Sequence, residues 1–151
     1  MTTVIPYLCV RDAAAALDFY RIAFDAVEDA RWTEDDGRIV HAQFTIGEAT
    51  CFVADEHPEI GVRAPSAYGG TPVSLVLRVA DADATVARAV AAGATVEQAV
   101  ADHPYHERRG WVVDPFGHRW AVNSRTEEVT EQELRERIGE ERGSAISQHR
   151  E

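Results

Sequence analysis

The chain has 151 residues, enough for one domain with its own hydrophobic core. Hydrophobic residues make up 45% of it, and no run of about 18 apolar residues suggests a transmembrane helix. The net charge of −11 argues against a nucleic-acid partner and against docking on an anionic membrane. The N-terminus lacks the basic and apolar segments of a secretory signal, so we expect a cytoplasmic protein with Cys9 and Cys51 reduced and buried.

The first half of the chain predicts one helix between short strands. Residues 4–10 are apolar and short, as strands are, and Asp12 is a candidate helix N-cap. A helix is expected over 13–24, where one apolar stripe contains Ala16, Leu17, Tyr20 and Phe24. The strands that follow are expected at about 27–33, 39–46 and 49–54.

The second half repeats this order. A strand at 73–79 precedes an N-cap at Asp81 or Asp83 and a helix that ends at Gly93. Further strands are expected at about 95–101, 109–114 and 119–124. An offset of 69 residues aligns similar side chains, namely Val4 with Val73, Leu8 with Leu77, Val10 with Val79, Asp12 with Asp81, Ala13 with Ala82 and Val27 with Val96.

Each half therefore predicts a βαβββ module, and we place the modules at about 1–58 and 70–125 within one domain of residues 1–125. One helix can cover only one face of a module's sheet, so two modules can close their uncovered faces around a cavity. Residues 126–151 are expected to form a C-terminal helix of about 130–142 and a tail, because Thr130 and Glu133 have the spacing of a capping box.

The order of motifs over residues 4–125 resembles the vicinal oxygen chelate superfamily, and within it the PhnB-like glyoxalase/bleomycin-resistance group. The motifs are 10–13 before a helix with Phe19 and Tyr20, then 88–94, 114–120 and 126–129. The resemblance implies an α+β fold in which two βαβββ repeats form paired mixed sheets around a cavity, usually in a homodimer. It does not imply one reaction, because this fold carries many.

Alternation along the strands predicts which side chains face the cavity. The polar candidates for ligand binding are Tyr7, His41, Gln43, Arg78 and Asn123. The same reasoning places Cys51 and Val53 on the open face and Phe52 under the helix. Arg78 favours a ligand with a carboxylate, whereas the acidic chain and aromatic residues such as Trp32 favour a cationic or planar ligand.

In metal-dependent members of the superfamily, the first and the last strand of each half carry one metal ligand each, which makes four ligands in all. The resemblance places these ligands at Ile5, Cys51, Ser74 and Ala121, none of which is a histidine or a carboxylate. We therefore expect no metal and no cofactor, which removes the usual Lewis acid of glyoxalase or dioxygenase chemistry.

Two functions remain open at this stage. The first is a metal-independent protein that binds a small antibiotic-like molecule or metabolite. The alternative is a lyase, isomerase or epimerase, with or without metal. Its general base would be His41 or the polar loop with His103, His106 and Glu107. The same residues also have purely structural interpretations. His41 would then only form a hydrogen bond between strands, and the loop with His103 and His106 would only be part of the surface.

Overall fold

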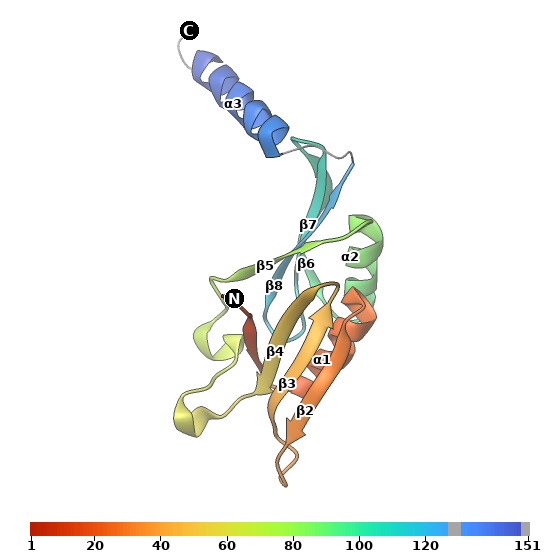
Figure 1. Ribbon diagram of the computed structural model, residues 1–151, viewed down its shortest axis with the longest axis vertical. Helices are drawn as coiled ribbons and strands as arrows, with labels where there is room; N and C mark the ends of the chain where they lie inside the picture. Colours follow the sequence, from red (N-terminus) through yellow and green to blue (C-terminus); the bar gives the residue numbers. More distant parts are fainter. Residues whose placement is uncertain (127–130, 149–151) are drawn as a thin grey trace.

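The structure is a computed structural model that describes residues 1–126 and 131–148. Eight strands and three α-helices account for most of the described residues (Figure 1). The first module contains β1 Tyr7–Val10, α1 Ala13–Phe24, β2 Val27–Thr33, β3 Ile39–Ile46 and β4 Ala49–Asp55. The second module contains β5 Ser74–Arg78, α2 Ala82–Ala91, β6 Thr95–His103, β7 Glu107–Val113 and β8 Arg119–Arg125, and α3 Glu131–Gln148 follows.

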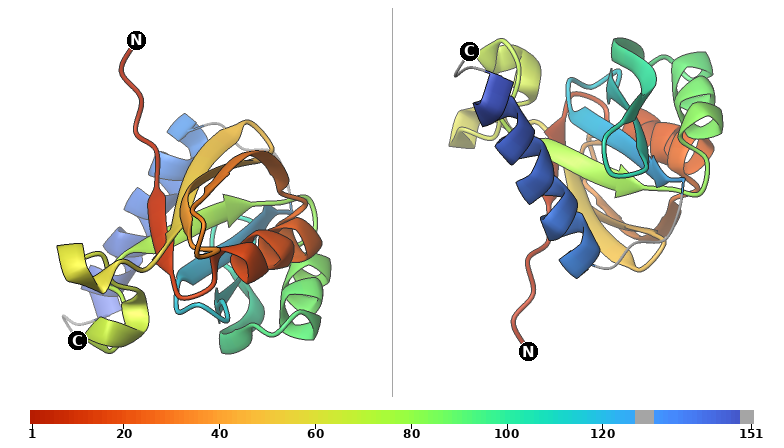
Figure 2. Two further views of the ribbon diagram at one scale, coloured as in Figure 1. Left: turned by 90° about the horizontal axis from the view of Figure 1, so that it is seen from below. Right: turned by 90° about the horizontal axis from the view of Figure 1, so that it is seen from above.

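The strands form two four-stranded mixed sheets with the same topology, β1-β4-β3-β2 and β5-β8-β7-β6. In each sheet the first and last strands of the module pair in parallel and the other neighbours are antiparallel. Helix α1 packs on the first sheet, α2 packs on the second, and the two helices contact each other (Figure 2). The predicted fold of two βαβββ modules is confirmed.

The 69-residue repeat extends to the hydrogen bonds that start each helix. Asp12 accepts a bond from the backbone N–H of Ala15, and Asp81 accepts one from Ala84, both at 3.0 Å. The first amide of each helix donates to the last strand of its own module: Ala13 to Asp55 at 2.6 Å and Ala82 to Ser124 at 3.3 Å. These contacts satisfy amides that a helix N-terminus leaves unpaired, so both modules fix their helix in the same way.

The two modules share one core. The ring of Tyr20, on α1, is fully buried and stacks on Phe44 of the first sheet at 5.1 Å between ring centroids. It also contacts Trp120 of β8 at 5.5 Å. Its hydroxyl donates to the buried carboxylate of Asp114 at 2.6 Å, and the Trp120 indole N–H donates to the same oxygen at 2.9 Å. The Asp114 carboxylate of the second module therefore anchors α1 of the first module through a hydrogen bond.

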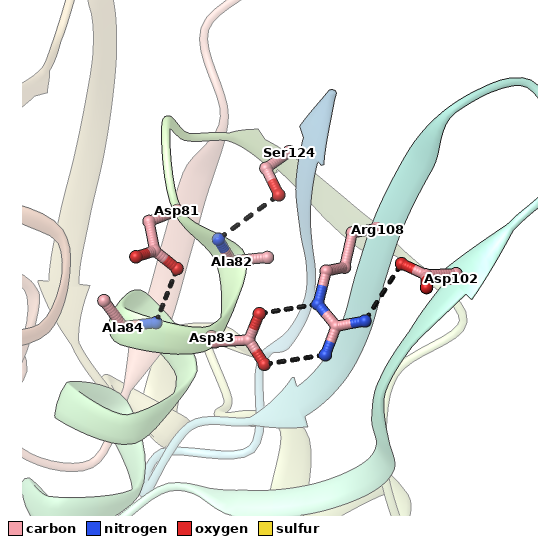
Figure 3. A network of polar contacts seen from close by, with 7 residues as sticks. All are labelled: Asp81, Ala82, Asp83, Ala84, Asp102, Arg108 and Ser124. Atoms are coloured by element: carbon pink, nitrogen blue, oxygen red, sulfur yellow. Dashed lines mark hydrogen bonds and ion pairs between the residues drawn. The ribbon is translucent and has the colours of Figure 1, made fainter. Parts of the chain in front are cut away.

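An arginine on β7 joins the β6–β7 hairpin to the start of α2 (Figure 3). Arg108 donates two hydrogen bonds to the Asp83 carboxylate, at 2.6 and 3.0 Å, and one to Asp102 at 2.9 Å. The hydrogen bonds from Arg108 lower the pKa of Asp83. The side chain of Arg108 thus lies on the helix side of the sheet, which leaves its neighbour Arg109 on the opposite face.

The ends of the chain differ from the sequence expectations. The first strand begins at Tyr7, and Val4, which was expected within it, is exposed. Helix α3 continues to Gln148 rather than ending near 142, and it extends away from the sheets beyond the ends of β7 and β8 (Figure 1). The capping residue Thr130 and residues 149–151 lie outside the described residues. None of the helices in the described part of the chain is long and apolar enough to span a membrane.

Candidate functional site

The open face of the first sheet carries a cluster of aromatic side chains around His41. The His41 ring lies 5.3 Å from Tyr7, 4.7 Å from Phe52 and 5.2 Å from Trp32, measured between ring centroids. Tyr7 is 56% exposed and Trp32 is 52% exposed. Large aromatic rings that stay half exposed on a sheet face form a surface on which a planar or apolar molecule can stack.

Polar contacts fix the orientation of the His41 ring. Its Nδ1 lies 2.8 Å from the Tyr7 hydroxyl, and its Nε2 lies 3.4 Å from the Gln43 amide nitrogen. With the Gln43 N–H directed at Nε2, the proton of a neutral ring sits on Nδ1 and is donated to Tyr7. The Tyr7 proton then points to the carbonyl of Val40 at 3.5 Å. His41 could act as a base through Nε2 only if a substrate displaced Gln43.

A cavity of about 530 Å³ adjoins this cluster. It lies at the end of the first sheet, beneath the segment that leads to the second module, and its lining is mainly apolar. Its lining residues are Tyr7, Leu8, Cys9, Glu34, Arg38, Val40, Ala54, Asp55, His57, Ile60 and Val62. The volume is in the range of small-molecule sites, and Tyr7 belongs to both the cavity and the aromatic cluster.

The two cysteines are free thiols, Cys9 half-buried and Cys51 buried. Burial raises the pKa of both thiols, and for Cys9 the nearby carboxylates of Glu56 and Asp55 raise it further. A thiol whose pKa is raised stays protonated near neutral pH and is a poor nucleophile. Cys9 lines the cavity, but we therefore expect its thiol to pack against a ligand and not to react with it.

The open face of the second sheet is rich in arginine. Arg78, Asn123 and Arg109 are register partners across β5, β8 and β7, so they form one row on this face. The neighbouring row contains Val76, Ala121 and Trp111. Arg119 lies over the Trp111 ring at 4.0 Å and donates to Glu97 and to Ser74.

The five predicted ligand-binding residues thus fall into two groups. Tyr7, His41 and Gln43 lie together on the first sheet, whereas Arg78 and Asn123 are paired on the second. Arg78 also borders a separate cavity of about 720 Å³ with residues of both modules. Sequence reasoning did not select Arg109, because the faces of its strand were not assigned.

The prediction of which β4 side chains lie under the helix was wrong. Cys51 and Val53 are core residues, paired with Phe44 and Ala42 of β3, and Phe52 lies on the open face. Cys51, Phe52 and Val53 are all apolar, so alternation could not show which of them faces the helix. The pairing with buried neighbours on β3 decides it.

The residues at the four superfamily metal positions do not suit a metal. Because Phe52, and not Cys51, lies on the open face of β4, the four candidate ligand positions become Ile5, Phe52, Ser74 and Ala121. This set contains no carboxylate, imidazole or thiolate, the donors that hold divalent ions. Among residues 1–126 and 131–148, no group of three or more His, Cys, Asp or Glu side chains could hold a metal ion.

The histidines of the second module border other parts of the structure. His103 and His106 border a polar cavity of about 400 Å³ at the tip of the β6–β7 hairpin. The ring Nε2 of His118 lies 2.9 Å from the carbonyl oxygen of Cys9, to which it must donate, because a carbonyl can only accept. His118 therefore links the second module to β1 of the first.

Comparison with known proteins agrees with this geometry. Residues 2–122 match the Glyoxalase/Bleomycin resistance protein/Dioxygenase superfamily. The chain belongs to this superfamily. An uncharacterized protein of Mycobacterium bovis is 44% identical over 132 residues, which cover 85% of this chain and 87% of the relative.

Solved structures of the superfamily fold are also similar. The structure of TioX from Micromonospora sp. ML1 is 26% identical with a TM-score of 0.63, covering 85% of this chain and all of TioX. A PhnB protein from Bacillus cereus is 19% identical with a TM-score of 0.64, covering 82% of this chain and 99% of its own. These structures share the fold of this chain.

Proposed function

We propose that this protein binds a small organic molecule, antibiotic-like or metabolite, on the open faces of its two sheets without a metal ion. The observation that carries the proposal is the character of these faces. They expose Tyr7, Trp32 and, at 64% exposure, Val76, and they place His41, Gln43, Arg78 and Asn123 beside these apolar groups. Apolar walls with a few placed polar groups are typical of small-molecule sites.

Metal independence rests on the donor set. Ile5, Phe52, Ser74 and Ala121 offer one hydroxyl between them, so these four positions do not supply the ligand shell that metal-assisted chemistry needs. Purified protein should therefore contain no stoichiometric zinc, nickel, iron or manganese by elemental analysis. Stoichiometric metal that is lost when Ser74 or its neighbours are substituted would contradict this part of the proposal.

We further propose a homodimer in the cytoplasm. The edge strand β2 leaves the apolar side chain of Val27 exposed, and a second copy is the simplest cover for this edge. Light scattering at micromolar concentration should give twice the mass of the chain. A monomer mass would exclude the dimer but not ligand binding.

Ligand binding can be tested by a thermal-shift panel of small molecules. A ligand present at 100 times its Kd stabilises the folded state by about 2.7 kcal/mol. For a chain of this length that corresponds to a rise in Tm of roughly 5–11 °C. The Tyr7→Ala and Trp32→Ala variants should lose this rise, whereas Ile22→Ala, which removes an exposed residue on the outer surface of α1, should retain it.

An enzyme is the second candidate, and the contact between Tyr7 and His41 favours it. A hydrogen bond to one ring nitrogen sets which nitrogen of an imidazole can take up a proton, and a histidine oriented in this way can act as a general base. If a compound from the panel is also converted, the rate should fall in the His41→Gln variant while binding persists. Binding without turnover in the parent would leave the binding protein as the function.

A further inference from the structure

A row of three polar residues crosses the open face of the second sheet. Arg78 on β5, Asn123 on β8 and Arg109 on β7 are direct register partners, so their side chains leave the sheet side by side. Within an acidic chain, two neighbouring arginines on one face make a local positive site.

The polar atoms of this row are incompletely satisfied. Asn123 is only 7% exposed, and its side-chain oxygen has no hydrogen-bond partner in the described part of the chain. The Nε of Arg109 is likewise buried without a partner, and its Nη2 lies 4.0 Å from a carboxylate oxygen of Glu107. No described residue forms a hydrogen bond or ion pair with the side chain of Arg78. Buried polar groups without partners are costly, so a bound molecule that satisfied them would gain affinity.

The neighbouring row supplies an apolar surface. Val76 is exposed, Ala121 is small, and Trp111 carries the Arg119 guanidinium over its ring at 4.0 Å. Ala121 itself is buried, so a flat molecule lying on Val76 beside Trp111 would direct one end to the row of Arg78, Asn123 and Arg109. The separation between the two rows is that between alternate residues along a strand, roughly 7 Å, which suits one aromatic ring with a substituent.

We infer that this row recognises the carboxylate of an aromatic or similarly flat organic acid, with Asn123 bonding to a hydroxyl or amino group beside it. The inference rests on the proposed function and names the ligand class of the same site. Arginine forms paired hydrogen bonds with carboxylates, and two arginines flanking one position exclude cationic ligands. The cationic ligand that the negative charge of the whole chain favours is thus opposed by the charge of this face.

The first test uses salicylate, a flat acid whose hydroxyl lies beside its carboxylate, and salicylamide, which lacks the negative charge. Calorimetry should detect salicylate binding, and salicylamide should bind at least about tenfold more weakly. NMR of the arginine Nε–H groups should show shifts at Arg78 and Arg109 on adding salicylate. Equal binding of the two compounds, no binding of salicylate, or no shift at either arginine would overturn the inference.

Variants make the test specific. Arg78→Gln and Arg109→Gln should each weaken salicylate binding about tenfold or more, whereas Arg31→Gln, which removes an arginine of the first module paired with Glu28, should not. The Asn123→Asp variant places a carboxylate between the two arginines. It should raise Tm and abolish salicylate binding, a combination that a merely damaged fold cannot produce. Unchanged binding in all these variants would overturn the inference.

The outcomes separate this inference from the proposed function. Suppose that salicylate does not bind, but a neutral or cationic compound raises the Tm of the parent and not that of Tyr7→Ala. The proposed binding function is then supported and the inference of a carboxylate ligand is wrong. If no compound of any charge stabilises the parent, both fall.

Discussion

The hydroxyl of Tyr20 joins the two modules by a buried hydrogen bond to Asp114, and removing it should destabilise the whole domain. Asp114 accepts four hydrogen bonds: from the Tyr20 hydroxyl and Trp120 indole on one oxygen, and from the backbone N–H groups of Phe116 and His118 on the other. Both Tyr20 and Asp114 are buried. The Tyr20→Phe variant removes one donor from a buried carboxylate and changes little else in the shape of the core.

A hydrogen bond to a charged group contributes about 1.5–3 kcal/mol to stability. We therefore expect Tyr20→Phe to lower the free energy of unfolding by that amount and Tm by roughly 3–12 °C. Urea denaturation should show a lower midpoint with an unchanged m-value, because the surface exposed on unfolding is the same. Tyr68→Phe is the matched control: Tyr68 is 68% exposed, and the same atom is removed from water.

The pH dependence provides a second measurement of the same contact. Burial raises the pKa of Tyr20 well above its ordinary value of 10.0, and Asp114 raises it further. The unfolded chain then loses this proton first, so the contribution of Tyr20 is complete below pH 10 and declines as the pH rises above it. The loss of stability above pH 10 should be shallower in Tyr20→Phe. A Tyr20→Phe variant as stable as Tyr68→Phe, with the alkaline slope of the parent, would refute the reasoning.

Three further variants test other parts of the structure. Arg108 lowers the pKa of Asp83 from 3.8, so the stability from this pair is present above pH 3.8 and is lost as the pH falls below it. The difference in free energy of unfolding between the parent and Arg108→Gln should therefore shrink as the pH falls below 3.8. In Gly110→Ala the new Cβ would lie 2.8 Å from Val100, and urea denaturation should show a loss of about 1–3 kcal/mol. Gly139→Ala, in α3 with nothing within 4 Å, should instead raise helicity measured by circular dichroism. Equal effects of the two glycine substitutions would contradict the packing argument.

The fold could be predicted from the sequence because its signals are local and occur twice. Asp12 and Asp81 cap their helices at the same position, and the apolar residues before them recur 69 positions apart. Strand β3 was predicted at its observed bounds because polar His41 and Gln43 alternate with buried Ala42 and Phe44. Where polar and apolar residues alternate, the face of a strand follows directly.

The site was predicted less completely because it depends on pairing between strands. In β4 the residues around Phe52 are all apolar, so the sequence pattern does not distinguish its faces. Arg108 and Arg109 are adjacent and identical, yet one bonds Asp83 on the helix side and the other joins the row with Asn123. Only the register of β7 against β8 tells them apart.

The repeat itself shows where the two modules differ. At equivalent positions of β1 and β5, the helix-side residues Leu8 and Leu77 are the same, whereas Cys9 on the open face corresponds to Arg78. Packing under a helix constrains the buried face of both strands in the same way, but nothing in a single chain constrains the open faces alike. One face is therefore aromatic around His41 and the other is cationic around Asn123, as expected if the two contact different ends of one molecule.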